Sequence, residues 1–179
     1  MVSAVEAVLA RLPARKAPGT TVLCLDGPAG SGKTTLAGAL VRRAPATQVV
    51  HTDELLEGWS GLPGLAASVE RLLRPLAAST PGRWRRWDWH TDRWAETHEV
   101  VAGPLLVVEG TGSWSSSIAD LVTVLVWVEA PSHVRLERGL ARDGEQMRPQ
   151  WEQWRREEDA LHQHLGTRER ADLLVETSR

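Results

Sequence analysis

Short apolar runs alternate with segments of helical periodicity along most of the chain. The apolar runs have the length of strands and occupy residues 21–26, 48–51, 104–110, 121–130 and 171–177. Between them, apolar residues recur with helical spacing at residues 5–12, 36–41 and 65–76. Runs without polar alternation are typical of strands covered on both faces. With no hairpin signal between them, this order predicts an α/β fold whose five strands form a parallel sheet flanked by helices.

These segments form one continuous series, because no internal repeat, low-complexity tract or long linker interrupts them. The length of 179 residues suits a single domain, and 42% hydrophobic with 25% charged residues is ordinary for a soluble globular protein. We therefore expect one domain over residues 1–179. The stretch PARKAPGT, residues 13–20, should end the first helix.

Charge and cysteine content narrow the classes of partner. The formal net charge of −2 gives no electrostatic reason to expect nucleic acid or an anionic membrane surface as partner. The longest uncharged apolar run, residues 121–128, is far shorter than the roughly 20 residues that a membrane helix needs. Cys24 has no second cysteine with which to form a disulfide. We expect a cytoplasmic protein that acts on a small molecule.

The strongest motif, GPAGSGKT at residues 27–34, lies between the first strand and the following helix. It matches the phosphate-loop pattern of Gly, four residues, Gly, Lys and Thr. Glycines let successive N–H groups converge on an anion at the positive end of the helix. Lys33 would then contact the β and γ phosphates, and the Thr34 hydroxyl would bind Mg²⁺. The predicted ATP-binding residues are Gly27, Ala29, Gly30, Ser31, Gly32, Lys33, Thr34 and Thr35.

Absent motifs separate the classes of phosphate-loop protein. The sequence contains neither the Asn-Lys-x-Asp guanine signature nor the Leu-Ser-Gly-Gly-Gln of transport ATPases. The apolar run at 104–110 contains Glu109 with no preceding Asp of the motor type. A GTPase switch and a transport ATPase are therefore disfavoured.

Four further stretches follow the phosphate loop, namely VVHTDELLEGW, RRWDWHTDRW, LLVVEGTGS and VRLERGLARDGEQMR. Together with the loop, their order resembles that of the uridine kinase and phosphoribulokinase group of small P-loop kinases. This resemblance implies a P-loop NTPase fold with an Arg-rich lid at about residues 136–150. It also implies Mg²⁺-dependent transfer of the γ-phosphoryl group of ATP to a hydroxyl of a nucleoside-like acceptor. The chain departs from the group at Trp87, where Tyr is usual, and no His follows Asp88 at the base-binding position.

Two carboxylates stand where they suit catalysis. Asp53 follows the second strand, where it would orient the acceptor hydroxyl and take its proton as general base. Capping the N-terminus of the next helix is its alternative role. Glu109 ends a strand, where it would hold Mg²⁺ directly or through water. Its alternative role is that of a turn residue before Gly110.

Arginine and tryptophan interleave in RWRRWDWHTDRW, residues 83–94. Such a pattern also occurs on surfaces that bind single-stranded nucleic acid, but Asp88, Asp92 and the near-neutral chain favour a pocket wall for one ring or sugar. We predict an acceptor pocket walled by residues 53–59 and 83–94, with some of the tryptophans closing the core instead. The predicted acceptor-binding residues are Asp53, Trp59, Trp87, Asp88, Trp89 and Arg93.

The lid segment carries arginines at helical spacing, because Arg135, Arg138 and Arg142 share one helix face. A planar guanidinium suits the oxygens of a phosphoryl group in transfer. Exposed ion pairs with Glu137 and Asp143 are the alternative role of these side chains. The predicted catalytic residues are Lys33, Asp53, Arg138 and Arg142.

Beyond the lid, Trp151 and Trp154 should pack on the domain, and the charge run that follows them in WEQWRREED should lie on the surface. The histidines show no zinc-ligand spacing, and Cys24 should be a core residue. A kinase for a nucleotide, a coenzyme precursor or an antibiotic hydroxyl is the near alternative to a nucleoside kinase. An ATP-binding regulatory protein without transfer activity is the alternative from another class.

Overall fold

The computed structural model of the protein describes residues 2–13 and 19–177, so part of the predicted helix-ending stretch at 13–20 lies outside the described residues. Its α-helices are α1 (Val2–Leu9), α2 (Lys33–Arg43), α3 (Leu65–Ala77), α4 (Ser132–Asp143), α5 (Arg148–Leu165) and α6 (Thr167–Arg170). Its strands are β1 (Thr21–Asp26), β2 (Thr47–His51), β3 (Gly82–Asp88), β4 (Arg93–Val100), β5 (Leu105–Glu109), β6 (Val124–Glu129) and β7 (Leu173–Glu176). Among these helices, none is both long enough and apolar enough to cross a membrane.

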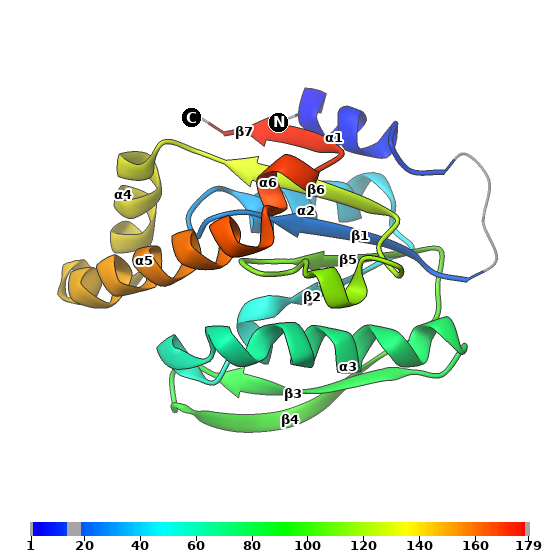
Figure 1. Ribbon diagram of the computed structural model, residues 1–179, viewed down its shortest axis with the longest axis horizontal. Helices are drawn as coiled ribbons and strands as arrows, with labels where there is room; N and C mark the ends of the chain where they lie inside the picture. Colours follow the sequence, from blue (N-terminus) through cyan, green and yellow to red (C-terminus); the bar gives the residue numbers. More distant parts are fainter. Residues whose placement is uncertain (1, 14–18, 178–179) are drawn as a thin grey trace.

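The main sheet has five strands in the order β2-β5-β1-β6-β7, and every neighbouring pair is parallel. This confirms the predicted α/β fold with a five-stranded parallel sheet. The strands end at one edge of the sheet, beside α4 and α5 (Figure 1). The loops that follow β1, β2 and β5 therefore meet at this edge, because these three strands are neighbours in the sheet.

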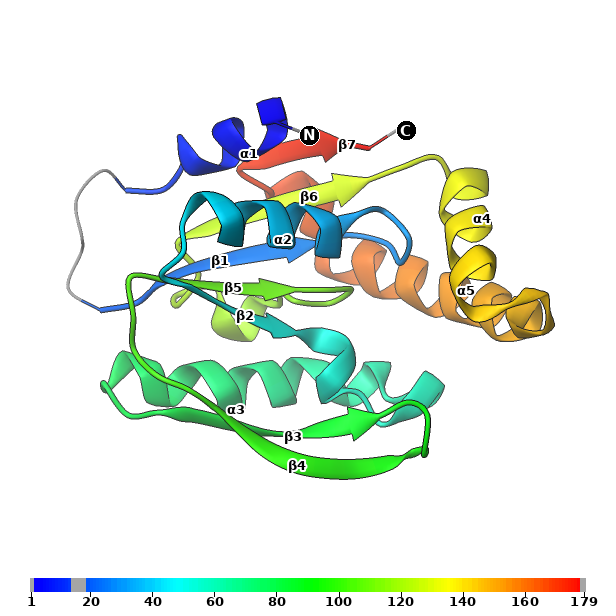
Figure 2. The same ribbon diagram turned by 180° about the vertical axis from the view of Figure 1, so that it is seen from behind.

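Helices cover both faces of the sheet, as the unbroken apolar strands require. Alternate residues of β1 enter two separate cores, with Leu23 and Leu25 on one side and Val22 and Cys24 on the other. Helices α1 and α2 close the first core, and α3 together with Trp154 of α5 closes the second. Figure 2 shows α2 lying over the face of the sheet that points away from the viewer in Figure 1.

Strands β3 and β4 form an antiparallel hairpin outside the main sheet, although we predicted none. The hairpin packs on α3 beyond the β2 edge of the sheet (Figures 1 and 2). Gly82 allows the contact, because a Cβ there would lie 2.2 Å from the carbonyl oxygen of Leu72. Both strands carry charged residues on one face and Trp on the other, so the segment lacks the apolar runs that mark the main sheet.

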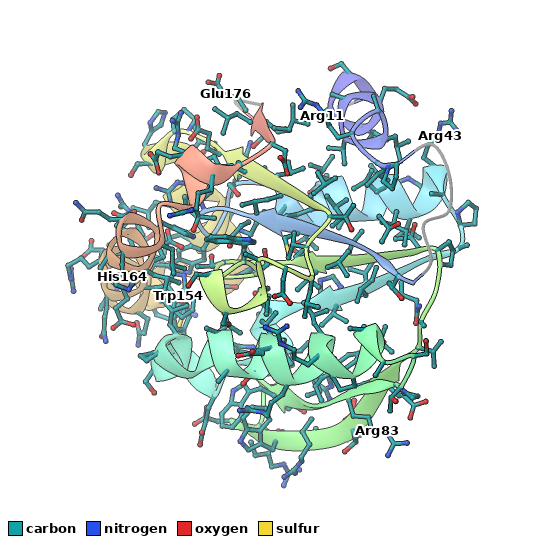
Figure 3. All side chains as sticks on the ribbon, turned by 45° about the vertical axis from the view of Figure 1, so that its right-hand side comes forward. Arg11, Arg43, Arg83, Trp154, His164 and Glu176 are labelled. Atoms are coloured by element: carbon teal, nitrogen blue, oxygen red, sulfur yellow. The ribbon has the colours of Figure 1, made fainter. Side chains whose placement is uncertain are left out.

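The Arg-rich segment spans the end of α4, a 3₁₀ turn and the start of α5. These helices cross closely at Gly139, where an added Cβ would lie 2.4 Å from the ring of Trp151. Trp151 and Trp154 are buried, which confirms that they pack on the domain. In Figure 3, Trp154 lies on the inner side of α5, whereas His164 points outward and Arg83 lies on the outer side of the hairpin.

Candidate active site

The phosphate-loop motif forms the turn from β1 into α2, as its flanking pattern predicts. Three glycines of the loop have left-handed backbone angles, with φ of 139° at Gly27, 77° at Gly30 and 95° at Gly32. Side chains rarely adopt these angles, so the loop depends on glycine at all three positions. A Cβ on Gly27 would also lie 2.1 Å from the carbonyl oxygen of Val128, so β6 leaves no room for one.

Lys33, the first residue of α2, is buried, and its side chain turns back into the phosphate loop. Its Nζ donates to the carbonyl oxygens of Gly27 and Pro28 at 2.7 and 2.8 Å. Burial lowers the pKa of the Lys33 ammonium, and the negative charges of Glu109 and other nearby carboxylates oppose that shift. The Lys33 ammonium therefore lies in the hollow of the loop, with three carboxylates and the Arg135 guanidinium within electrostatic range.

The second half of the loop is held from outside by side chains of other elements. Arg138 of α4 donates to the carbonyl oxygens of Gly30 at 3.0 Å and of Thr177, past the end of β7, at 2.8 Å. The Thr177 hydroxyl donates in turn to the carbonyl oxygen of Ser31. The carbonyl groups of Gly30 and Ser31 thus accept hydrogen bonds from side chains outside the loop.

The inner side of the loop fits an anionic ligand. The first turn of α2 has no side-chain cap, so its N–H groups point to the loop without a side-chain acceptor. The Ser31 hydroxyl is buried and has no hydrogen-bond partner among the described residues. Polar groups of this kind suit the oxygens of a nucleotide phosphate, and the loop residues therefore fit ATP.

Thr34 and Glu109 meet beside the loop, where magnesium was predicted. The Thr34 hydroxyl donates to Oε1 of Glu109 at 3.0 Å, and Nδ1 of His51 lies 2.5 Å from the same oxygen. This hydrogen bond to Glu109 raises the pKa of His51 above its ordinary value. One carboxylate and one hydroxyl are the ligand set with which proteins bind Mg²⁺ beside substrate phosphates. No cluster of three or more His, Cys, Asp or Glu side chains among the described residues offers a complete protein cage for a metal.

Asp53 lies in a short 3₁₀ helix directly after β2, next to this pair. Its predicted alternative role is wrong, because His51 is the N-cap of that helix and Asp53 lies in its first turn. The side chain reaches solvent at the edge of the site. The protein atoms around it and the charge of Glu109 raise the pKa of Asp53, while His51 and Arg142 oppose that rise. The site therefore holds a carboxylate of raised pKa beside the predicted metal ligands.

Arg142, from the segment predicted to be a lid, lies at the end of α4 within electrostatic range of Asp53. Its guanidinium forms an ion pair with Asp143 at 2.7 Å and lies 5.7 Å from the centre of the Trp151 ring. The Asp143 hydrogen bond and, more weakly, the charge of Asp53 raise the pKa of Arg142. Arg138 is held differently, since its guanidinium is bound to the outer side of the loop. The two predicted catalytic arginines thus lie in different places.

The hairpin reaches the site at its turn, and only some of the predicted acceptor residues face it. Trp89 is exposed and its Nε1 donates to the carbonyl oxygen of Asp53 at 3.0 Å. Trp59 is half-buried and makes edge-on ring contacts with Trp89, Trp151 and Trp154, with centroids 5.6 to 6.2 Å apart. These rings join the hairpin turn to α5. Arg93 is exposed at the start of β4.

Two predicted acceptor residues have structural roles instead. Trp87 is buried, with its ring centroid 5.1 Å from that of Trp94, so it closes the hairpin core and is not an open stacking surface. The Asp88 carboxylate accepts the backbone N–H groups of His90 and Thr91 at 2.9 and 3.3 Å. Asp88 therefore caps the hairpin turn, which is a common use of aspartate.

A buried polar network under the loop was missed by the sequence analysis. The carboxylate of Asp26 accepts N–H groups from Gly27 at 2.7 Å, from Gly112 at 2.9 Å and from Trp114 at 2.9 Å. Nε2 of His162, on α5, lies 3.2 Å from the same carboxylate. Asp26 and His162 are both buried, and they join the base of the loop to the segment after β5.

Glu158 is the second buried carboxylate of this network, and it lies one helical turn before His162 on α5. It belongs to the charge run that was predicted to be exposed, and that prediction is wrong for this residue. Burial raises the pKa of Glu158, and the Ala29 N–H together with the charges of Lys33 and Arg135 opposes the rise. The signal was present in the sequence, because Glu158 and His162 continue the helix face of Trp151 and Trp154.

Comparison with known proteins adds to this geometry. A family model described as an AAA domain matches residues 23–163. No match is found among curated protein sequences. A possible uridine kinase from Bacillus stearothermophilus is 21% identical, with a TM-score of 0.68 over 98% of this chain and 96% of that one. Shikimate kinase from Acinetobacter baumannii, in complex with shikimate, is 18% identical, with a TM-score of 0.55 over 89% of this chain and 85% of that one.

At these identities the two solved structures show a shared fold. The family match extends from β1, through the phosphate loop and the segment after β5, to α5, and so includes every element that forms the site. The chain therefore belongs to the AAA domain family and has the P-loop α/β fold seen in the possible uridine kinase.

Proposed function

We propose that the protein is an ATP- and Mg²⁺-dependent phosphotransferase that moves the γ-phosphoryl group to a hydroxyl of a small molecule, with a nucleoside-like acceptor as the leading class. One observation carries this proposal. The phosphate loop, the Thr34–Glu109 pair and Asp53 follow three neighbouring parallel strands, β1, β5 and β2, and meet at one edge of the sheet. A nucleotide-binding loop, a metal-binding pair and a base are the parts that such a transfer requires.

ATP would be bound by the loop residues from Gly27 to Thr35, with its phosphates at the first turn of α2. Lys33 would exchange its hydrogen bonds to the carbonyl groups of Gly27 and Pro28 for phosphate oxygens. Thr34 and Glu109 would hold Mg²⁺, which when bound would offset negative charge on the phosphates.

Asp53 would act on the acceptor. As the acceptor hydroxyl oxygen forms its bond to the γ-phosphorus, the bond from phosphorus to the ADP oxygen breaks, and the Asp53 carboxylate takes the hydroxyl proton. The raised pKa of Asp53 supports this role, because a base accepts a proton more readily as its pKa approaches the working pH. Arg142 is the arginine of the predicted lid whose charge acts on this carboxylate. We assign to Arg142 the role of stabilising the negative charge on the phosphoryl group during transfer.

The acceptor would lie between Asp53 and the hairpin turn. Trp89, exposed and bonded to the backbone of Asp53, is the ring best placed to stack on it, with Trp59 behind Trp89. Arg93 remains an exposed candidate on the hairpin. Because Trp87 and Asp88 have structural roles, only Asp53, Trp59, Trp89 and Arg93 of the predicted acceptor residues remain to indicate the class of acceptor. Nucleotides, coenzyme precursors and antibiotics with a free hydroxyl are the near alternatives.

Measuring ADP formation with a panel of acceptors tests the proposal, with the Lys33→Ala variant as control. We expect acceptor-stimulated ADP formation by the parent and its loss in the variant, because the lysine serves phosphate binding. A parent that binds ATP without acceptor-stimulated turnover would favour the regulatory protein over the kinase.

A further inference from the structure

The Glu158 carboxylate receives donors from its own helix and from three other parts of the chain, although it is completely buried. Its Oε2 accepts the backbone N–H of Ala29 in the phosphate loop at 2.7 Å and Nε1 of Trp154 at 3.0 Å. The Thr111 hydroxyl, from the segment after β5, reaches the same oxygen at 3.4 Å. Its Oε1 accepts from Nη1 of Arg135, on α4, at 2.8 Å.

Electrostatic attraction to a nucleotide does not explain this carboxylate. Glu158 lies within electrostatic range of Lys33, so its negative charge opposes the binding of anionic phosphates. Burying an ion pair is also costly, and apolar side chains of similar volume often replace such a pair without loss of stability. Apolar side chains would leave the Ala29 N–H and Nε1 of Trp154 without this acceptor, and of these two donors only Ala29 belongs to the phosphate loop, outside any helix or strand.

The same contact connects the loop to α4. Arg135 forms an ion pair with Glu158. The backbone carbonyl oxygen of Arg135 would lie 2.5 Å from a Cβ on Gly30. Helix α4 therefore touches the loop one residue after Ala29. His162, one turn further along α5, reaches Asp26 at the base of the loop. Helix α5 thus supports the loop at two successive places, Ala29 and Asp26.

We propose that Glu158 is a positioning residue, which fixes the first half of the phosphate loop through Ala29 and ties it to α4 through Arg135. The inference rests on the proposed ATP binding at the same loop. It assigns to Glu158 no contact with ATP and no step of the transfer.

Two double variants separate the shape of the loop from the buried charge. Arg135→Met with Glu158→Leu removes the ion pair and leaves the Ala29 N–H and Nε1 of Trp154 without their acceptor. Arg135→Met with Glu158→Gln removes the same ion pair, but the amide oxygen still accepts from Ala29. Both replace the charged pair together, so neither leaves one charge buried alone, which is the change that would unfold the protein.

ATP affinity is measured by calorimetry, and folding by thermal unfolding without ATP. We expect the dissociation constant of the Leu variant to rise at least about tenfold, because an unpaired N–H lets the loop rearrange. The Gln variant should recover most of that loss. If charge alone mattered, the two variants would bind ATP equally, because both remove the same pair of opposite charges, and equal affinity in the two variants would overturn the positioning role.

Failure of the proposed function looks different, because it would appear in the parent itself, either as no ATP binding or as ATP binding without acceptor-stimulated turnover. A measurement on the parent also covers the case in which the Leu variant does not fold. Amide hydrogen exchange, followed by NMR without ATP, should show a protected Ala29 N–H beside a faster Gly30 N–H. Exchange at Ala29 as fast as at Gly30 would refute the proposed contact.

Discussion

Replacing Gly30 by alanine should both destabilise the fold and weaken ATP binding, because the phosphate loop is in direct contact with the backbone of α4 at this residue. Gly30 has a φ of 77°, and its new Cβ would lie 2.5 Å from the backbone oxygen of Arg135. A backbone oxygen cannot rotate away as a side chain would, so either the loop or α4 must move.

The loss of stability has two parts, the strain of an alanine at positive φ and the overpacking against the Arg135 oxygen. An alanine in the left-handed region costs about 1 to 2 kcal/mol. Overpacking a closed contact costs typically about 1 to 3 kcal/mol more, which gives a total of about 2 to 5 kcal/mol. For a chain of this length each kcal/mol lowers the unfolding midpoint by about 2 to 4 °C, so a fall of about 4 to 20 °C is expected. ATP affinity should fall at least about tenfold, equivalent to about 1.4 kcal/mol.

Gly64→Ala is the matched control. Gly64 has ordinary negative φ, and a Cβ there would meet no atom within 4 Å. This variant should unfold within a few degrees of the parent and bind ATP equally well. Scanning calorimetry and ATP titration on both variants decide the matter. Parental stability and affinity in Gly30→Ala would refute the close contact between the loop and α4.

Two further predictions concern the chemistry of the site. Thr34→Val and Glu109→Gln should each move the Mg²⁺ titration of activity to higher concentration, because the first removes a hydroxyl ligand and the second removes the negative charge of a carboxylate ligand, and an unchanged curve for Glu109→Gln would assign that residue to structure alone. Asp53→Asn should lower kcat by about 10²- to 10⁴-fold with ATP affinity little changed. Because the pKa of Asp53 is raised, the parent should lose activity as the pH falls through a value above the ordinary aspartate pKa of about 3.9. That acid limb should disappear in Asp53→Asn, and a near-parental kcat in the variant would contradict its role as base.

The main sheet could be predicted because its strands are buried on both faces. Such strands appear as unbroken apolar runs, and all five predicted runs contain the observed strands or most of them. The loop motif was equally clear, because glycine at Gly27, Gly30 and Gly32 reflects backbone angles that other residues avoid.

The hairpin could not be recognised in the same way. It covers α3 with one face only, and its other face carries arginines and glutamates in solvent. Its turn begins at Asp88, whose carboxylate accepts two backbone N–H groups, and Asp92 adopts a φ of 52°. Such turn chemistry depends on local hydrogen bonds, and we interpreted Asp88 as an acceptor-binding residue instead.

The support beneath the loop was missed for a different reason. A charge run is usually exposed, and we did not extend the predicted packing face of Trp151 and Trp154 to Glu158, which is buried while neighbouring charged residues are not. Its partners, Ala29 and Arg135, lie 129 and 23 residues away along the chain. Spacing along one helix indicates which face a residue shares, but it does not reveal such distant partners.

Following the phosphoryl group itself tests the central claim most directly. Phosphorus NMR of the parent with ATP, Mg²⁺ and the acceptor that most stimulates ADP formation should show a new phosphate monoester, formed in equal amount to ADP. The Lys33→Ala variant, under the same conditions, should leave ATP unchanged. Release of inorganic phosphate without a monoester, or the same product from the variant, would contradict transfer to a hydroxyl at this site.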